Sequence, residues 1–175
     1  MTPLEGELIR LRAVEPADVA WMYRWENDPA VWRVSGTLAP FSHHQLARFV
    51  EEQQFDIFQT RQQRLIIERR ADNAPVGAFD LFEFDPLNRR AGIGILIHPA
   101  GERGKGFAAE ALAVACRYGR EVLQLHQLWG TAGADNAASR RLLEQAGFCA
   151  AGTRRDWLRT PSGYTDAVFY QKILE

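Results

Sequence analysis

Three apolar runs follow one another between residues 64 and 98, and short stretches of turn-forming residues separate them. The runs read RLIIERR (64–70), PVGAFDLFEF (75–84) and AGIGILIH (91–98), with ADNA and DPLN among the residues between them. Each run has the length and the apolar content of a strand, and each connection is rich in residues that favour turns. The middle of the chain is therefore predicted to form a meander of antiparallel strands.

Helices are predicted on both sides of this meander. The segment EPADVAWMYRWEN (15–27) carries Pro16 and acidic residues in its first turn, where the helix dipole favours them. Apolar residues at helical spacing predict further helices over residues 42–60, 107–122 and 136–147. Additional strands are expected at residues 7–14 and 127–133, and as a C-terminal hairpin that turns at residues 161–163.

Residues 1–175 are predicted to form one domain, because a chain of this length buries a substantial core without disulfides or metals. Strands cluster in the middle of the chain and helices follow them. This order favours an α/β protein of the α+β kind, in which helices flank a mixed, mostly antiparallel central sheet of about seven strands.

Charge and composition argue against several classes of protein. The formal net charge is −1, whereas nucleic-acid binders usually carry a strongly basic patch, so no nucleic-acid partner is expected. No window approaches the roughly 18 apolar residues of a membrane span, and the first residues lack a signal-peptide pattern. We therefore expect a cytoplasmic protein without a membrane partner. Cys116 and Cys149 are interpreted as small buried residues rather than as a disulfide or a metal site.

Two glycines and two cations precede the helix predicted from residue 107, in the stretch RGKGFA (103–108). Unpaired N–H groups at a helix start bind anions, and glycine lets an oxygen approach the backbone closely. Arg103 and Lys105 add positive charge that suits phosphate. The stretch is interpreted as an anion-binding loop, although glycines before a helix also occur for turn geometry alone.

Two familiar phosphate loops do not fit this stretch. The ATP-binding P-loop needs a glycine where Pro99 stands and a hydroxyl where Gly106 stands. The dinucleotide fingerprint matches superficially as Gly104-x-Gly106-x-x-Ala109, but it belongs directly after a strand, with an acid about 20 residues later. Six residues separate Ile97 from Gly104, and position 124 is glutamine. Binding of ATP or of a dinucleotide is therefore the weaker interpretation.

The stretch instead resembles the pyrophosphate-binding loop of the GNAT superfamily of N-acetyltransferases, whose pattern is Arg/Gln-x-x-Gly-x-Gly/Ala. IGILIHP (93–99) looks like the splayed fourth strand of that family, and DNAASRRLLEQAGF (135–148) is similar to its Asn-x-x-Ser and Gly-Phe segment. LIRLRAVEPADVAWMYRWENDP (8–29) resembles the opening of the branch that contains diamine, spermidine and ribosomal-protein N-terminal acetyltransferases. The resemblance covers nearly the whole chain and implies the GNAT fold.

The resemblance implies acetyl-CoA as the co-substrate and no metal. The pantetheine arm would pair with the strand backbone at Ile95, Leu96 and Ile97. The pyrophosphate would lie on the amides of Arg103, Gly104, Lys105, Gly106, Phe107 and Ala108. Asn136 and Ser139 are expected to contact CoA as well, and from the residues alone Asn136 is equally a helix N-cap.

The proton transfers are less clearly marked in the sequence. Many relatives carry a tyrosine acid where this chain has Leu143 and a glutamate base where it has Gly92. The candidates that remain for catalysis are His98, Tyr164 and Glu83, each of which also has a plain structural interpretation. A second possibility is that positioning and solvent suffice, because a thioester is already activated.

The acceptor is expected to be a small-molecule or peptide amine. Residues 15–60 hold seven acids and three bases, which favours a cationic acceptor. The residues predicted to bind it are Trp25, Glu26 and Trp32, although two tryptophans at helical spacing also suit a core. A diamine or polyamine is the first interpretation and a protein N-terminal amine the second. A non-catalytic acyl-CoA-binding domain is the alternative of another class, and a homodimer is compatible with the resemblance.

Overall fold

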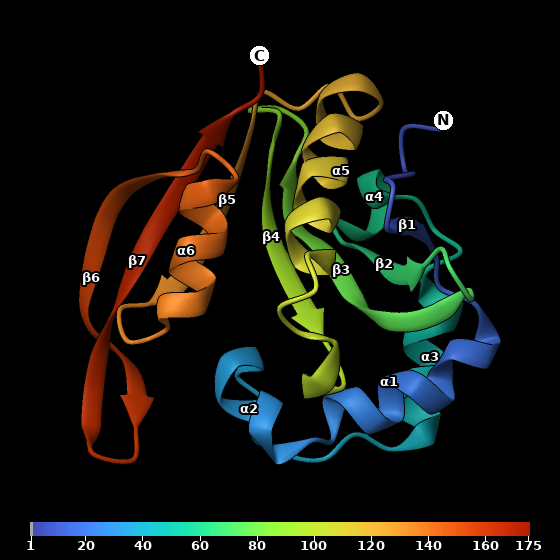
Figure 1. The fold of residues 1–175 in the computed structure, drawn as a ribbon, viewed down its shortest axis with the longest axis horizontal. Helices are drawn as coiled ribbons and strands as arrows, with labels where there is room; N and C mark the ends of the chain where they lie inside the picture. Colours follow the sequence, from blue (N-terminus) through green and yellow to red (C-terminus); the bar gives the residue numbers. More distant parts are fainter. Residues whose placement is uncertain (1) are drawn as a thin grey trace.

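The computed structural model describes residues 2–175, which contain a seven-stranded sheet in the order β1-β2-β3-β4-β5-β7-β6 (Figure 1). Its strands are β1 (Ile9–Ala13), β2 (Gln63–Arg69), β3 (Ala74–Asp85), β4 (Arg90–Ile97), β5 (Gln127–Gly133), β6 (Cys149–Thr160) and β7 (Gly163–Ile173). Only β4 and β5 pair in parallel among these strands. The predicted meander, the C-terminal hairpin and the mixed, mostly antiparallel sheet are confirmed.

The helices are α1 (Val19–Glu26), α2 (Pro29–Ser35), α3 (His43–Glu52), α4 (Ile57–Thr60), α5 (Phe107–Glu121) and α6 (Ala137–Gln145). Single 3-10 turns, η1 (Pro16–Asp18) and η2 (Ala100–Glu102), precede α1 and α5. Within residues 2–175, none of the helices has the length and hydropathy to cross a bilayer.

One helix prediction was wrong in detail, and one helix was not predicted. The single helix expected over residues 42–60 is broken into α3 and α4, because Asp56 accepts hydrogen bonds from the amides of Phe58 and Gln59 and starts a new helix. Helix α2 was not predicted from the sequence. Its signals are an N-cap at Asp28, whose carboxylate accepts from Ala30, and Gly36 in the left-handed conformation at its end.

The two faces of the sheet bury different side chains. Alternate residues of β4, such as Ile93 and Ile97, belong to the core under α5, together with Leu112. On the opposite face, Ile66 of β2 packs with Trp25 of α1 and with residues of α3. Figure 1 shows α5 lying along β3 and β4, whereas α1 and α3 lie together near the other end of β2 and β3. The sheet is therefore covered on both faces at its centre.

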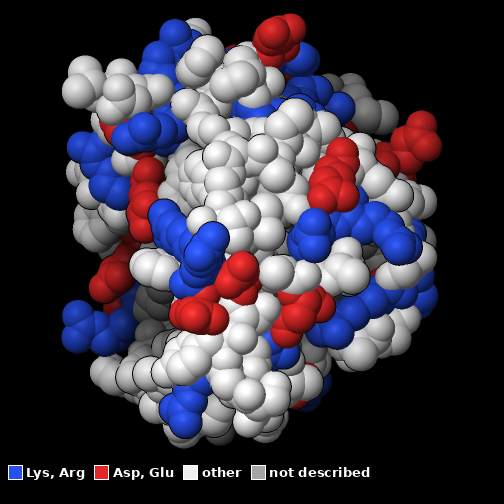
Figure 2. Space-filling view, turned by 90° about the vertical axis from the view of Figure 1, so that its left-hand side faces the viewer, with Lys and Arg blue, Asp and Glu red and all other residues white. Residues whose placement is uncertain are grey.

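Strand β6 forms one edge of the sheet and pairs only with β7 in the described chain. Nearly all of its residues are exposed, and they include Arg154, Arg155 and Asp156. Figure 2, which views the molecule from this side, shows side chains of both charges interspersed with uncharged ones. Charged side chains on an edge strand discourage pairing with other chains. The homodimer stays a prediction.

The parallel pair β4–β5 separates soon after it begins. Three register pairs join the strands, the last of them Gly92 with Trp129. Beyond this point the described residues of β4 and β5 form no further pairs, and Figure 1 shows the two strands diverging. The edge of β4 from Ile93 to Ile97 consequently faces a gap, and the remaining features of the site surround this gap.

Candidate functional site

The glycine-rich loop leads directly into α5 and leaves its amides free. Gly104 and Gly106 have φ angles of 76° and 87°, in the left-handed region that favours glycine, and Gly106 is the N-cap of α5. Within residues 2–175, the amides of residues 104–109 donate no hydrogen bond. A row of free N–H groups at the positive end of a fifteen-residue helix is suited to bind an anion.

Charged side chains around the loop are arranged to leave the amides accessible. Glu102 accepts bonds from Arg69 at 2.8 Å and from Lys105 at 3.0 Å, and these cations lower the pKa of its carboxyl, Lys105 most strongly. Glu110 in the first turn of α5 faces away from the loop. Its carboxylate accepts three backbone amides of residues 7–9 at 2.7–2.8 Å. No acid of the loop region therefore competes with an anion for the free amides within the described chain.

Two cavities lie side by side along the open edge of β4. One has a volume of about 530 Å³ and contains the glycine loop, and we name it the loop cavity. The other has a volume of about 630 Å³ and contains Glu26, Arg64 and Asp80, and we name it the ion-pair cavity. Both are lined by Val31, Val34, Ile95, Leu96, Ser139 and Leu142. Together they form a continuous groove between β4 and α6, with α2 on a third side.

The predicted cofactor residues gather at the loop cavity. Its lining includes Ile95, Leu96, Ile97, Arg103, Gly104, Gly106, Phe107, Ala108, Asn136 and Ser139. Lys105 is outside the lining and pairs with Glu102 instead. Asn136 is the N-cap of α6, since its side-chain oxygen accepts the amide of Ser139 at 3.1 Å. Residues more than forty positions apart in the sequence thus face one cavity.

The two departures from the family pattern have structural explanations. Leu143 is 6 % exposed and lines the ion-pair cavity, so an apolar side chain stands where the resemblance implied a tyrosine. A Cβ atom at Gly92 would lie 2.5 Å from the ring of Phe82 and 2.8 Å from that of Trp129. These two rings pack edge to face with centroids 5.3 Å apart. The space of a glutamate at position 92 is therefore filled by aromatic rings.

The three predicted catalytic residues do not line either cavity. His98 bonds through Nε2 to Asp28 at 2.8 Å, and the pKa of Asp28 is lowered first by the amide of Ala30 and next by this histidine. Tyr164 is 65 % exposed at the tip of the β6–β7 hairpin. Glu83 is exposed in a bulge of β3. His98 directly follows β4 but its ring is bonded to Asp28, and the catalytic role of all three residues stays a prediction.

The three predicted acceptor residues are divided between core and cavity. Trp25 is 1 % exposed and packs in the core beneath α1 and α3. Trp32 donates its indole N–H to the backbone oxygen of Glu26 at 2.8 Å and thereby ties α2 to the end of α1. Glu26 alone of the three lines the ion-pair cavity. Its carboxylate bonds to Arg64 at 2.5 Å.

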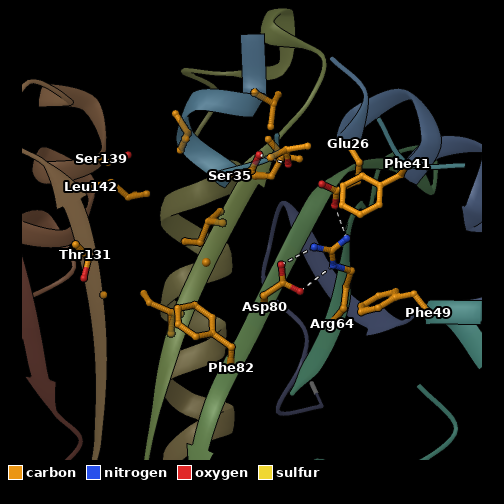
Figure 3. A pocket seen from close by; sticks show the side chains of 18 of the residues that line it. Glu26, Ser35, Phe41, Phe49, Arg64, Asp80, Phe82, Thr131, Ser139 and Leu142 are labelled. Carbon is orange, nitrogen blue, oxygen red and sulfur yellow. Dashed lines mark hydrogen bonds and ion pairs between the residues drawn. The ribbon is translucent and has the colours of Figure 1, made fainter. Parts of the chain in front are cut away.

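Sequence reasoning missed Arg64 and Asp80, which face each other from neighbouring strands. They are register partners in the β2–β3 pair, and the guanidinium of Arg64 holds both oxygens of Asp80 at 2.8 Å. Figure 3 shows this ion pair with Glu26 above it, Phe49 beside Arg64, and Thr131 across the gap. A signal was present in the sequence, because Asp80 interrupts the apolar run AFDLF.

Comparisons with known proteins identify the family of this chain. Residues 9–149 match the family model described as an acetyltransferase (GNAT) domain. An uncharacterized N-acetyltransferase derived from the SPbeta prophage of Bacillus subtilis (strain 168) is 28 % identical over 166 residues, which cover 94 % of this chain and 89 % of that protein. Spermidine N(1)-acetyltransferase of Escherichia coli (strain K12) is 27 % identical over 147 residues, 82 % of this chain and 74 % of that one.

A solved structure shows the same fold. The crystal structure of spermidine N-acetyltransferase from Vibrio cholerae, in complex with CoA and spermine, superposes with a TM-score of 0.86. Sequence identity is 21 %, and the match covers 97 % of each chain. The family model spans most of the sheet, the glycine loop and α6. The chain belongs to the GNAT family of N-acetyltransferases.

Proposed function

We propose that this protein transfers the acetyl group of acetyl-CoA to a primary amine of a diamine or polyamine. The observation that carries the proposal is the continuous groove along the open edge of β4. One end of the groove holds free backbone donors for an anion, and the other end holds carboxylates that suit a cation. A donor and an acceptor bound in the two cavities would meet beside Ile95 and Leu96.

The residues of the loop cavity fit the proposed co-substrate. The amides of residues 104–109 have no partner in the described chain and would accept the pyrophosphate oxygens. Beyond Gly92 the described part of β5 does not pair with β4, so the backbone of Ile95 and Ile97 would pair with the amide groups of the pantetheine arm, as an added strand does. The carbonyl oxygen of Ile97 accepts from Nε of Arg103 at 3.3 Å, a bond that the arm would have to replace or share. When bound, acetyl-CoA supplies a thioester, which is an activated acyl group.

The contribution of this chain to the reaction would then be binding, orientation and exclusion of water. Leu142 and Leu143 give α6 an apolar wall beside the edge of β4. Exclusion of water would strengthen electrostatic interactions in the groove, and binding of the donor and the acceptor in the two cavities would hold the reacting atoms together. Because Gly92 and Leu143 carry no acid or base, the amine would arrive neutral or lose its proton through solvent in the groove.

The acceptor class is supported by charge and by the relatives. Several acids of residues 15–60 have partners outside the two cavities. Asp18 pairs with Arg12, Asp28 pairs with His98, and Asp56 caps α4. Glu26 is the acid of this segment that lines the ion-pair cavity. Spermidine is the acceptor that the name of the E. coli relative gives, and a diamine or polyamine is the cationic amine that we assign to this chain.

A thiol-release assay with acetyl-CoA and a panel of amines tests the proposal. The panel comprises putrescine, spermidine, spermine, n-butylamine and a peptide with a free N-terminus. We expect kcat/KM for the best diamine or polyamine to exceed that of n-butylamine by at least about tenfold, which corresponds to roughly 1.4 kcal/mol for one ionic contact.

Two outcomes would overturn this function. A preference for the peptide would identify an N-terminal acetyltransferase. Binding of CoA without turnover of any amine would identify a non-catalytic acyl-CoA-binding domain. A thermal shift titration with CoA, run on the same preparation, separates the second outcome from an inactive sample.

A further inference from the structure

Glu26, Arg64 and Asp80 form a largely buried ionic triad with one excess negative charge. The side chains are 12 %, 15 % and 20 % exposed in that order. Arg64 donates through Nε and Nη2 to Asp80 and through Nη1 to Glu26. Burial alone lowers the pKa of Arg64, but the two carboxylates outweigh burial and raise it, so the guanidinium stays charged. Two carboxylates against one guanidinium leave a balance of −1.

Stability alone is a poor reason for such a triad. Replacing buried ion pairs by well-packed apolar residues is often neutral or stabilising, because taking charges out of water is costly. The surroundings of this triad are apolar already, since Phe41, Phe49 and Leu46 line the same cavity. The other polar side chains that line the cavity are uncharged: Ser35, Thr37, Gln45, Thr131 and Ser139. The excess charge of the triad is therefore not neutralised by another charged residue of the lining, and in a partly enclosed cavity it attracts a cation more strongly than it would in open water.

The backbone next to Asp80 leaves room for a ligand. Asp80 of β3 is the register partner of Gly94 of β4, on the strand that borders the gap. A Cβ atom at Gly94 would have only ordinary contacts, 3.8 Å from Asp80 and from Phe82, whereas the space at Gly92 is filled. Gly94 also lines the ion-pair cavity. The carboxylate of Asp80 thus stands next to the open part of β4, two residues past the point where β4 and β5 separate.

We propose that the triad binds an ammonium group of the diamine or polyamine other than the amine that reacts, with Asp80 as the residue that contacts this ammonium group and Arg64 as the residue that positions its carboxylate. The inference rests on the proposed function and names the part of the cavity that selects a cationic amine. Glu26 shares the guanidinium and keeps the triad negative. Arg64 holds Asp80 through both oxygens, which fixes the plane of the carboxylate beside Gly94.

The test is Asp80→Asn, measured in the thiol-release assay with spermidine and with putrescine. The substitution keeps the size of the side chain and an oxygen that accepts from Arg64, but it brings the triad to zero net charge. We expect the KM for the amine to rise by about tenfold or more, while the KM for acetyl-CoA stays within about twofold. Asp80→Glu restores the charge and is expected to recover much of the lost affinity.

Asp85→Asn is the matched control. Asp85 lies at the end of the same strand, pairs with Arg90 at 3.1 Å and does not line either cavity, so its loss should leave both KM values unchanged. If Asp80→Asn fails to fold, Glu26→Gln removes the same excess charge from α1 without altering β3. It is expected to raise the amine KM in the same way.

The outcomes separate this inference from the proposed function. The inference alone is overturned if the wild-type protein acetylates amines but Asp80→Asn leaves the KM for the amine unchanged. If Asp80→Asn does not fold, an unchanged amine KM in Glu26→Gln has the same consequence. An equal rise of both KM values would do the same, because it would indicate a structural role for the triad. Wild-type protein that acetylates no amine would instead overturn the proposed function.

Discussion

Gly106→Val is expected to weaken CoA binding severely. Gly106 has a φ of 87°, a conformation that a β-branched residue adopts only with strain. Valine in this conformation would be strained by about 2 kcal/mol, and the backbone would relax by turning the following amides away from the loop cavity. We therefore expect the Kd for CoA and the KM for acetyl-CoA to rise roughly 30-fold or more. Calorimetric titration with CoA measures the first value and the thiol-release assay the second.

Gly101→Ala is the control for this variant. Gly101 lies in η2, just before the loop, and a Cβ atom there would meet no atom within 4 Å. Gly101→Ala should therefore bind CoA like the wild type. If Gly106→Val also binds CoA normally, the assignment of residues 104–109 as the pyrophosphate site is wrong.

Gly92→Ala is expected to destabilise the protein, although it adds only a methyl group. The new Cβ would lie 2.5 Å from Phe82 and 2.8 Å from Trp129, and the edge-to-face packing of these rings would have to shift. Overpacking of this kind costs about 2 kcal/mol, which lowers Tm by roughly 4–8 °C in a protein of this size.

Gly94→Ala provides the comparison on the same strand. Its Cβ would lie 3.8 Å from the nearest side chains, an ordinary contact, so its Tm should stay close to that of the wild type. Equal Tm values for Gly92→Ala and Gly94→Ala would contradict the packing explanation for the missing glutamate. The comparison uses stability alone and is independent of the acceptor.

The fold was predictable because local signals agreed with one another. Turn-forming residues separate the strands of the meander, and Asn136 and Gly147 mark the two ends of α6 in the sequence and in the structure. Helix α2 was missed because its seven residues carry only a short apolar pattern, and its start and stop signals at Asp28 and Gly36 were not combined. The glycine-rich loop could be proposed as an anion site from the sequence because its residues are contiguous.

The ion-pair cavity, where we propose that the acceptor binds, was less predictable because its residues come from separate elements. Arg64 and Asp80 are sixteen positions apart and meet through strand register, which the sequence does not state. Trp25 was predicted at the cavity, but a tryptophan on an amphipathic helix can face either the core or the groove, and here it faces the core. The aromatic pair at Gly92 also depends on register, since Phe82 and Trp129 flank this glycine from neighbouring strands.

Amide hydrogen exchange with and without saturating CoA is the most direct test of the account. In the proposed function, the donor lies along the open edge of β4 with its pyrophosphate on the start of α5. We predict that the amides of residues 104–109, which have no partner in the described chain, and those of the exposed edge of β4 become protected when CoA binds. Saturation by CoA that leaves exchange at residues 104–109 as fast as in the free protein would contradict it.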